Sequence, residues 1–191
     1  MIDYLTHYYK PGRRPFQSLS ALPEDEAVRI MQDLYEETVF SARFKDPSQY
    51  LRDRKQTEQW VRRKFIEKGG CPREPHPVYM VLGGSRWIKA HALLEGALGE
   101  IRIPLSVFQP GDVSFTYPDS MISQWFGADQ PQEYYLPDYH GKVFTLAEIL
   151  DIVEARGVPE ECWETHLPDD LAPYIEAQVW NHDPLSKYAL Q

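Results

Sequence analysis

Apolar and polar positions follow two different periods along this chain, and the change of period separates helical segments from strands. Apolar residues recur every three or four positions from Pro23 to about Thr38 and from Pro47 to about Lys68. This spacing predicts two amphipathic helices. A proline suits the first turn of a helix, and Gly69-Gly70 is typical of a helix end, so both flanks agree with the period.

The middle of the chain carries the period of strands. Val78–Leu82 is a short apolar run, which predicts a buried strand. Apolar residues alternate with polar ones over 101–107, where Pro104 cannot donate to a ladder and therefore favours a sheet edge. The same alternation returns in Val113–Tyr117 after a turn. These two alternating segments are predicted to pair as an antiparallel hairpin.

The remaining segments complete an α+β order. Residues 86–98 fit either a helix or a loop, and 127–141 is typical of a long polar-aromatic loop before a short strand at 142–144. Thr145 and Glu148 match a capping box, which predicts a helix that ends near Gly157. A last helix is expected from about Asp170 to Trp180. We therefore predict a single domain over 1–191, with a central antiparallel or mixed sheet flanked by about four helices.

Composition narrows the class of protein. The chain has 191 residues, 42% of them hydrophobic and 13% aromatic, which is typical of a packed core rather than of disorder. No apolar run is long enough for a membrane span, and 1–16 lacks the apolar region of a secretory signal. Cys71 and Cys162 form no CxxC pair, which favours reduced thiols in the cytoplasm.

Charge is spread unevenly. The segment from Arg43 to Arg73 contains ten Lys or Arg and four Asp or Glu, a local charge of +6. The segment from Asp112 to Asp183 contains two Lys or Arg and fifteen Asp or Glu, a local charge of −13. Two interpretations stay open: the segments attract each other within the fold, or the basic one is a binding face. The net charge of −9 makes nucleic acid an unlikely partner.

The second helix places charge where its period predicts apolar residues. Arg54 falls in the middle of the apolar face and Glu58 lies beside it. Buried charges need partners, so one interpretation is an i,i+4 pair or an Arg54 stem packed on the core. The other is that Arg54 faces a ligand.

Several loops and strand ends carry candidate chemistry. Ser85 and Arg86 follow Gly83-Gly84 after a strand, an arrangement that suits a phosphate or carboxylate, or else is a plain turn with a solvent-facing Arg. Tyr117 and Asp119 stand at a strand end, where Asp119 is a candidate acid or base or a turn former. His140 on the aromatic loop is a candidate general base or a packed histidine.

Standard catalytic and phosphate-binding motifs are missing, and no two histidines have the spacing of a helical metal pair, so we expect no metal. His7 lies in an N-terminal cluster of aromatic residues and cations, 7–14. This cluster suits an anionic ligand held through arginine, or a first strand whose tyrosines pack on the core.

Three segments carry a resemblance: YMVLGGSRW at 79–87, FTYPDS at 115–120 and LPDYHGKVF at 136–144. They resemble a bacterial family of uncharacterised proteins over most of the chain, a likeness that implies no activity. The chain also resembles ADP-ribosyltransferase-like folds, which place a His or Arg on the first strand and hold NAD on a split antiparallel sheet. His7 and the sheet from Tyr79 to Tyr117 correspond to those features, at the level of the fold alone.

Two functions follow as hypotheses. The first is a small-molecule enzyme or binder for an anionic, nucleotide-like ligand, with Asp119 and His140 as catalytic candidates and with Arg54, Ser85, Arg86, Tyr117 and His7 as binding candidates. The second is a protein-interaction or regulatory protein without catalysis, suggested by the charge asymmetry. The sequence names no cofactor and no reaction.

Overall fold

A five-stranded antiparallel sheet forms the centre of the molecule in the computed structural model, which describes residues 2–35, 41–93, 98–132, 135–158 and 173–189. The strand order is β3-β1-β2-β5-β4, and every neighbouring pair is antiparallel. The strands are β1 (Tyr4–Tyr9), β2 (Val78–Leu82), β3 (Gly99–Pro104), β4 (Val113–Thr116) and β5 (Glu176–Val179). The α+β class predicted from the sequence is confirmed.

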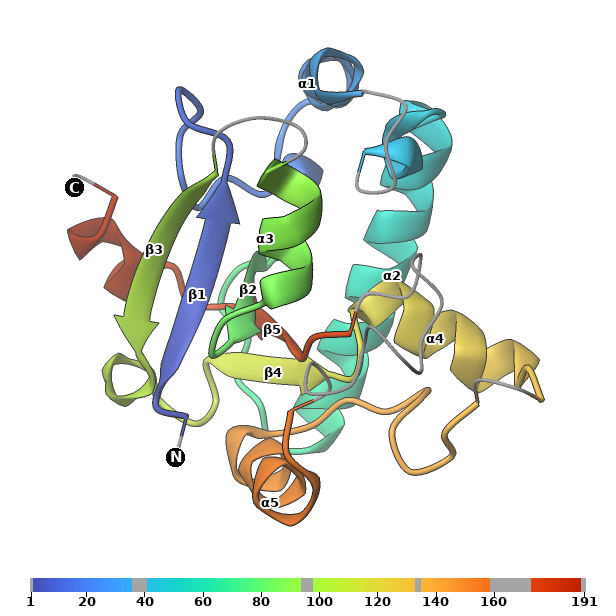
Figure 1. Cartoon of the computed structure of the whole chain (residues 1–191), viewed down its shortest axis with the longest axis vertical. Coiled ribbons are helices and arrows are strands. Elements are labelled where there is room, and N and C mark those ends of the chain that lie inside the picture. The colour runs from blue at the N-terminus through green and yellow to red at the C-terminus, as the bar shows by residue number, and fades with distance from the viewer. Residues whose placement is uncertain (1, 36–40, 94–97, 133–134, 159–172, 190–191) are drawn as a thin grey trace.

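Five α-helices surround this sheet among the described residues (Figure 1). They are α1 (Glu24–Leu34), α2 (Pro47–Glu67), α3 (Arg86–Leu93), α4 (Ser120–Asp129) and α5 (Leu146–Arg156). Short 3-10 turns connect them: η1 (Leu19–Ala21), η2 (Ala42–Phe44), η3 (Leu105–Val107) and η5 (Asp183–Lys187). No helix in the described part of the chain is long and apolar enough to cross a membrane.

The two faces of the sheet differ in chemistry because side chains alternate along each strand. One face buries the main apolar core, which includes Leu5, Met80, Phe115, Val179 and, from α5, Ile149. The other face is largely polar. Registered neighbours across it form a row from β1 to β4: Thr6, Val81, Glu176 and Thr116. This polar face is the one on which the candidate site lies.

Several predicted elements are confirmed, and their local signals explain why. α2 begins at Pro47 after the N-cap Asp46, whose carboxylate accepts the Gln49 N–H at 2.9 Å, and it ends before Gly69 at φ 86°. The Thr145–Glu148 capping box opens α5. The first predicted helix is present as Glu24–Leu34, but it ends earlier than predicted, because Tyr35 is already extended; positions 36–38 lie outside the described residues.

The predicted hairpin is wrong. β3 pairs with β1 and β4 pairs with β5, so the two segments stand at opposite edges of the sheet. Alternation shows that a segment is a strand, but it does not choose the partner. β3 also ends at Pro104, and 105–107 is a 3-10 turn rather than more strand.

The predicted last helix is also wrong where the structure describes it, because 176–179 is the strand β5 between β2 and β4. The start of that predicted helix at Asp170 lies outside the described residues. A central strand is buried on both faces, and Glu176 and Gln178 occupy positions where a buried strand usually carries apolar residues. Polar residues at these positions are not typical of a central strand, although their alternation with Ala177 and Val179 is that of a strand.

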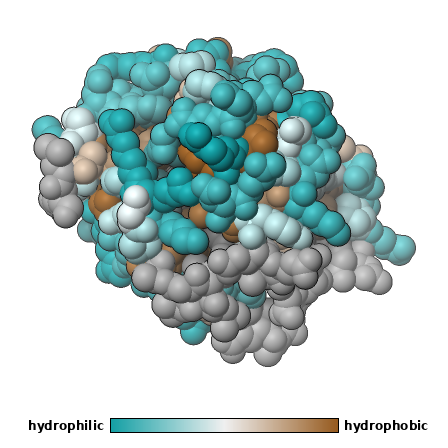
Figure 2. All heavy atoms as spheres, turned by 90° about the horizontal axis from the view of Figure 1, so that it is seen from above, coloured by the Kyte–Doolittle hydropathy of each residue, from teal (hydrophilic) through white to brown (hydrophobic). Residues whose placement is uncertain are grey.

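The oppositely charged segments meet within the fold. Ion pairs join Lys68 to Glu148 at 2.7 Å, Arg73 to Asp183 at 3.2 Å and Arg54 to Glu176 at 3.9 Å. In these three pairs the charge asymmetry holds α2 and its following loop against the acidic C-terminal half. Seen from above, the surface of the molecule is mainly hydrophilic, and apolar residues show in its recesses (Figure 2).

Candidate functional site

A cavity of about 600 Å³ opens on the polar face of the sheet. It lies between α2, α3 and the start of α4, with η1 and η2 completing the wall. We call Arg54, Tyr79, Asp119 and Glu176 its floor, and the exposed residues Arg43, Lys45 and Asp46 its rim. Aromatic rings line the walls between them: Tyr8, Phe44, Tyr50, Trp87, Trp125 and Tyr174.

Arg54 occupies the floor because α2 turns this part of its inner face toward the sheet. Its guanidinium lies over the Tyr79 ring at 3.4 Å from the ring centroid, a cation–π contact. Nε stands 3.9 Å from Glu58 and Nη2 stands 3.9 Å from Glu176, and the side chain is 13% exposed. Among the described residues no hydrogen bond accompanies these contacts, so its N–H groups stay available to a ligand.

Glu58 holds Arg54 in place from behind. Its carboxylate is 1% exposed and accepts hydrogen bonds from Ser20 Oγ at 2.7 Å and Tyr79 OH at 2.9 Å. The other oxygen contacts His76 Nδ1 at 2.6 Å. A buried carboxylate with this many hydrogen-bond partners is satisfied within the fold and needs no ligand. Arg54 thus pairs with Glu58, as the first interpretation predicted, and it also lines the cavity.

Two carboxylates share the N-terminus of α4. Asp119 Oδ1, the N-cap, accepts the N–H groups of Met121 at 2.9 Å and Ile122 at 3.1 Å. Glu176 Oε1 accepts from Ser120 N at 3.2 Å and from Gln178 Nε2 at 3.0 Å. Burial, together with the nearby charge of Glu176, raises the pKa of Asp119 to about 6. Asp119 can therefore exist in both protonation states near neutral pH, which is the property of an acid–base group.

His7 lines the edge of the cavity from β1, but its ring packs on Phe16 on the Leu5 side of the sheet, and both ring nitrogens are engaged. Phe16 N donates to Nε2 at 2.9 Å, so Nδ1 carries the proton and donates to the Tyr79 carbonyl at 3.0 Å. Burial lowers the pKa of His7 to about 4. The imidazole is neutral at physiological pH and joins β1, β2 and the following loop, so its role at the site is to position backbone.

Four of the predicted site residues lie away from the cavity lining. Ser85 Oγ accepts the Ile88 N–H at 3.0 Å in the first turn of α3, and Arg86 is exposed. The Tyr117 ring packs at 4.7 Å on Tyr139. The structure thus brings together Arg54, Asp119 and the edge of His7, and it leaves these others elsewhere.

His140 is the fourth. Its Nδ1 accepts the Leu136 N–H at 3.0 Å, and its ring meets Phe126 edge-on at 5.1 Å. Burial lowers the pKa of His140 to about 4. This histidine packs its own loop against α4, as the simpler of the two interpretations expected.

Glu176 and the aromatic walls were missed by sequence analysis. Glu176 was assigned to a helix, although Glu-Ala-Gln-Val at 176–179 alternates with a strand period that could have exposed it. Trp87, Tyr174 and Tyr50 come from three separate segments, and nothing in the order of the chain indicates that they meet. Their convergence is a property of the tertiary structure.

The described residues contain no group of three or more His, Cys, Asp or Glu side chains placed to hold a metal ion. Three comparisons were made, with protein-family models, with curated proteins and with solved structures, and none gives a match to this chain.

Proposed function

We propose that this protein binds a small anionic, nucleotide-like molecule in the cavity and performs acid–base chemistry on it through Asp119. The observation that carries the proposal is the guanidinium of Arg54, which stands in the floor beside two carboxylates at 3.9 Å and donates no hydrogen bond to any described residue. An arginine held in place with donors available is suited to a ligand group that offers hydrogen-bond acceptors.

The size and walls of the cavity support the proposal. A volume of about 600 Å³ lies within the range of small-molecule sites, roughly 300–1,000 Å³. Aromatic rings in the walls provide flat apolar surface, and Trp125 is 47% exposed beside the opening. A planar heterocycle is the kind of group that such rings bind by stacking.

The resemblance to ADP-ribosyltransferase-like folds adds NAD to the ligands worth testing. In support, Glu176 on β5 lies in the floor of this cavity, and His7 on the first strand is among the residues that line it. Such a ligand also agrees with the cytoplasmic location that we infer from the pattern of cysteines. The alternative of an interaction protein without catalysis is less favoured, because ion pairs inside the fold use part of the charge asymmetry on which it was based.

The test is a thermal-shift screen with nucleosides, nucleotides, NAD and phosphorylated metabolites. A ligand present at about 100 times its dissociation constant should stabilise the protein by about 2.7 kcal/mol. Arg54→Lys keeps the positive charge between the carboxylates and removes the planar fork, so it should lose most of this stabilisation. Arg86→Lys makes the same change outside the cavity and should bind as the wild type does. The proposal fails if no ligand stabilises the protein, or if both variants respond equally.

A further inference from the structure

We infer an orientation for the ligand: its uncharged heterocyclic end enters the floor, and its anionic group remains at the rim. The floor is complementary to an amide- or amidine-type edge, in which a hydrogen-bond donor stands beside an acceptor. This inference rests on the proposed function, because it assigns the two ends of a nucleotide-like ligand within the same cavity.

The charge of the floor argues against an anion there. Arg54 is the positive group, and it already faces Glu58 and Glu176 at 3.9 Å each. Asp119 adds a third carboxyl from the start of α4. A phosphate placed on Arg54 would stand close to the carboxylates of Glu58 and Glu176 in a site where water screens charge poorly. A neutral group meets no such repulsion.

The hydrogen-bonding groups that remain available on the floor come as a mixed pair. Asp119 Oδ1 and Glu176 Oε1 are each held by two N–H donors, which fixes both side chains. The second oxygens, Asp119 Oδ2 and Glu176 Oε2, accept no hydrogen bond from any described residue. Arg54 supplies donors next to these acceptors. A neutral edge that carries one acceptor and one donor satisfies both.

The walls above the floor suit a flat ring. Trp87 lies on α3 with its ring centroid 4.4 Å from that of His91 and 6.2 Å from that of Tyr174. Trp87 is buried, whereas Trp125 on α4 is 47% exposed, and both line the cavity. A heterocycle held between such rings would present its polar edge downward to the floor.

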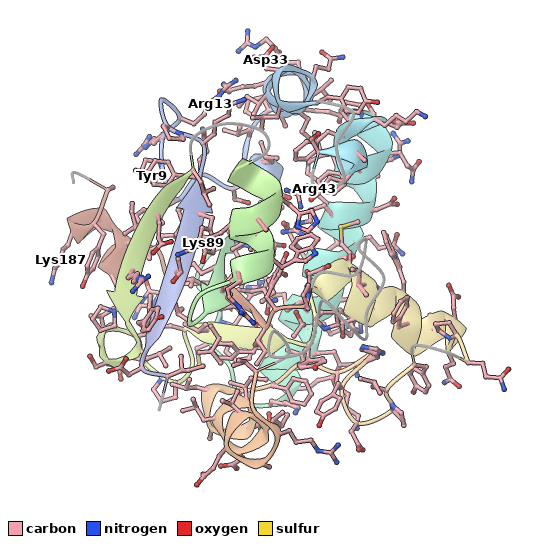
Figure 3. The ribbon with its side chains drawn as sticks, in the orientation of Figure 1. Tyr9, Arg13, Asp33, Arg43, Lys89 and Lys187 are labelled. Carbon is pink, nitrogen blue, oxygen red and sulfur yellow. The ribbon has the colours of Figure 1, made fainter. Side chains whose placement is uncertain are left out.

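The rim offers the cations that the floor lacks. Arg43 and Lys45 stand at and just after η2, both exposed, and Arg43 lies between α3 and α2 (Figure 3). The rim carboxylate Asp46 is engaged as the N-cap of α2, where it accepts the Gln49 N–H. Exposed cations in water can bind a phosphate without the desolvation that a buried anion requires. The floor thus suits the neutral heterocycle of a nucleotide, and the rim suits its anionic group.

The orientation can be tested by isothermal titration calorimetry at neutral pH with three probes: a set of ribonucleosides, their 5′-monophosphates, and inorganic phosphate. We expect at least one nucleoside to bind, its monophosphate to bind more tightly, and inorganic phosphate not to bind at millimolar concentration. Lys45→Met at the rim should weaken binding of the monophosphate about fivefold and leave the affinity for the nucleoside unchanged. Glu176→Gln on the floor should weaken nucleoside and monophosphate alike, by about tenfold. Lys64→Met, on the outside of α2, is the matched control and should change neither.

The possible failures are distinguishable. Binding of inorganic phosphate that competes with the monophosphate and is lost in Arg54→Lys would place the anion on the floor, and would overturn the orientation while the proposed function stands. Nucleoside binding that is indifferent to Glu176→Gln would also overturn it. If nucleosides, monophosphates and phosphate all fail to bind, the proposed function falls and the orientation with it.

Discussion

Replacing Arg54 by methionine removes the cation from the centre of the buried cluster while keeping a long apolar stem. The variant leaves Glu58 and Glu176, with side chains 1% and 5% exposed, without the guanidinium that stands 3.9 Å from each. Breaking a buried ion pair from one side costs about 3–5 kcal/mol, since the remaining charge stays desolvated. Folded proteins are stable by only about 5–15 kcal/mol, so this loss is large.

Urea unfolding followed by circular dichroism measures the change in the free energy of unfolding. Lys64→Met is the control, because Lys64 pairs with Glu67 at 2.8 Å with both side chains about half exposed. An exposed pair of this kind contributes about 0–1 kcal/mol. We therefore expect the loss in Arg54→Met to be several times the loss in the control.

The pH dependence gives a second, independent outcome. Burial raises the pKa of Asp119 to about 6, and the charge of Arg54 is one of the causes that hold it down, so without Arg54 this carboxyl binds a proton still more readily in the folded state than in the unfolded state. Folding then takes up protons, so the stability of the variant falls as pH rises. The loss relative to wild type should be larger at about pH 8 than at about pH 5. A loss below about 1 kcal/mol, or one independent of pH, would refute the view that Arg54 compensates buried carboxylates.

Three further predictions concern the rest of the fold. The wild type should lose stability as pH falls from about 6.5 toward 4, because the pKa of His7 is lowered to about 4 and the unfolded chain then binds the extra proton. The full contribution of His7, about 3 kcal/mol, is present above about pH 6.5. A His7→Gln variant whose urea midpoint falls just as steeply over this pH range would contradict the assignment. Gly127→Ala should destabilise by about 1–3 kcal/mol in thermal unfolding, because the new Cβ would lie 2.3 Å from Gly141 Cα; wild-type stability in this variant would show that the loop yields. Thr145→Ala should cost about 1 kcal/mol by removing the N-cap of α5, whereas Thr145→Ser keeps the hydroxyl and should retain most of the stability, and equal losses in the two variants would argue against a capping role.

Local signals in the sequence were sufficient for elements whose ends and faces are decided within a few residues. α2 follows from its period, from proline in its first turn and from Gly69 after its end. The capping box at Thr145 and Glu148 fixes the start of α5 for the same reason, since both partners lie within one turn. Sequence alone also marked Arg54 as a charge on a buried face, in conflict with the local pattern. This residue lies in the floor of the cavity.

Tertiary structure alone decided which strands pair and which side chains meet. β3 and β4 have nearly the same pattern of alternation, yet they lie at opposite edges because β1, β2 and β5 separate them. Glu176 can occupy a central strand because the amide of Ser120, the side chain of Gln178 and the charge of Arg54 surround its carboxylate. These partners come from parts of the chain far from β5 in sequence, apart from Gln178. A burial that depends on distant partners has no local signature, so the cavity and its floor appear only once the chain is folded.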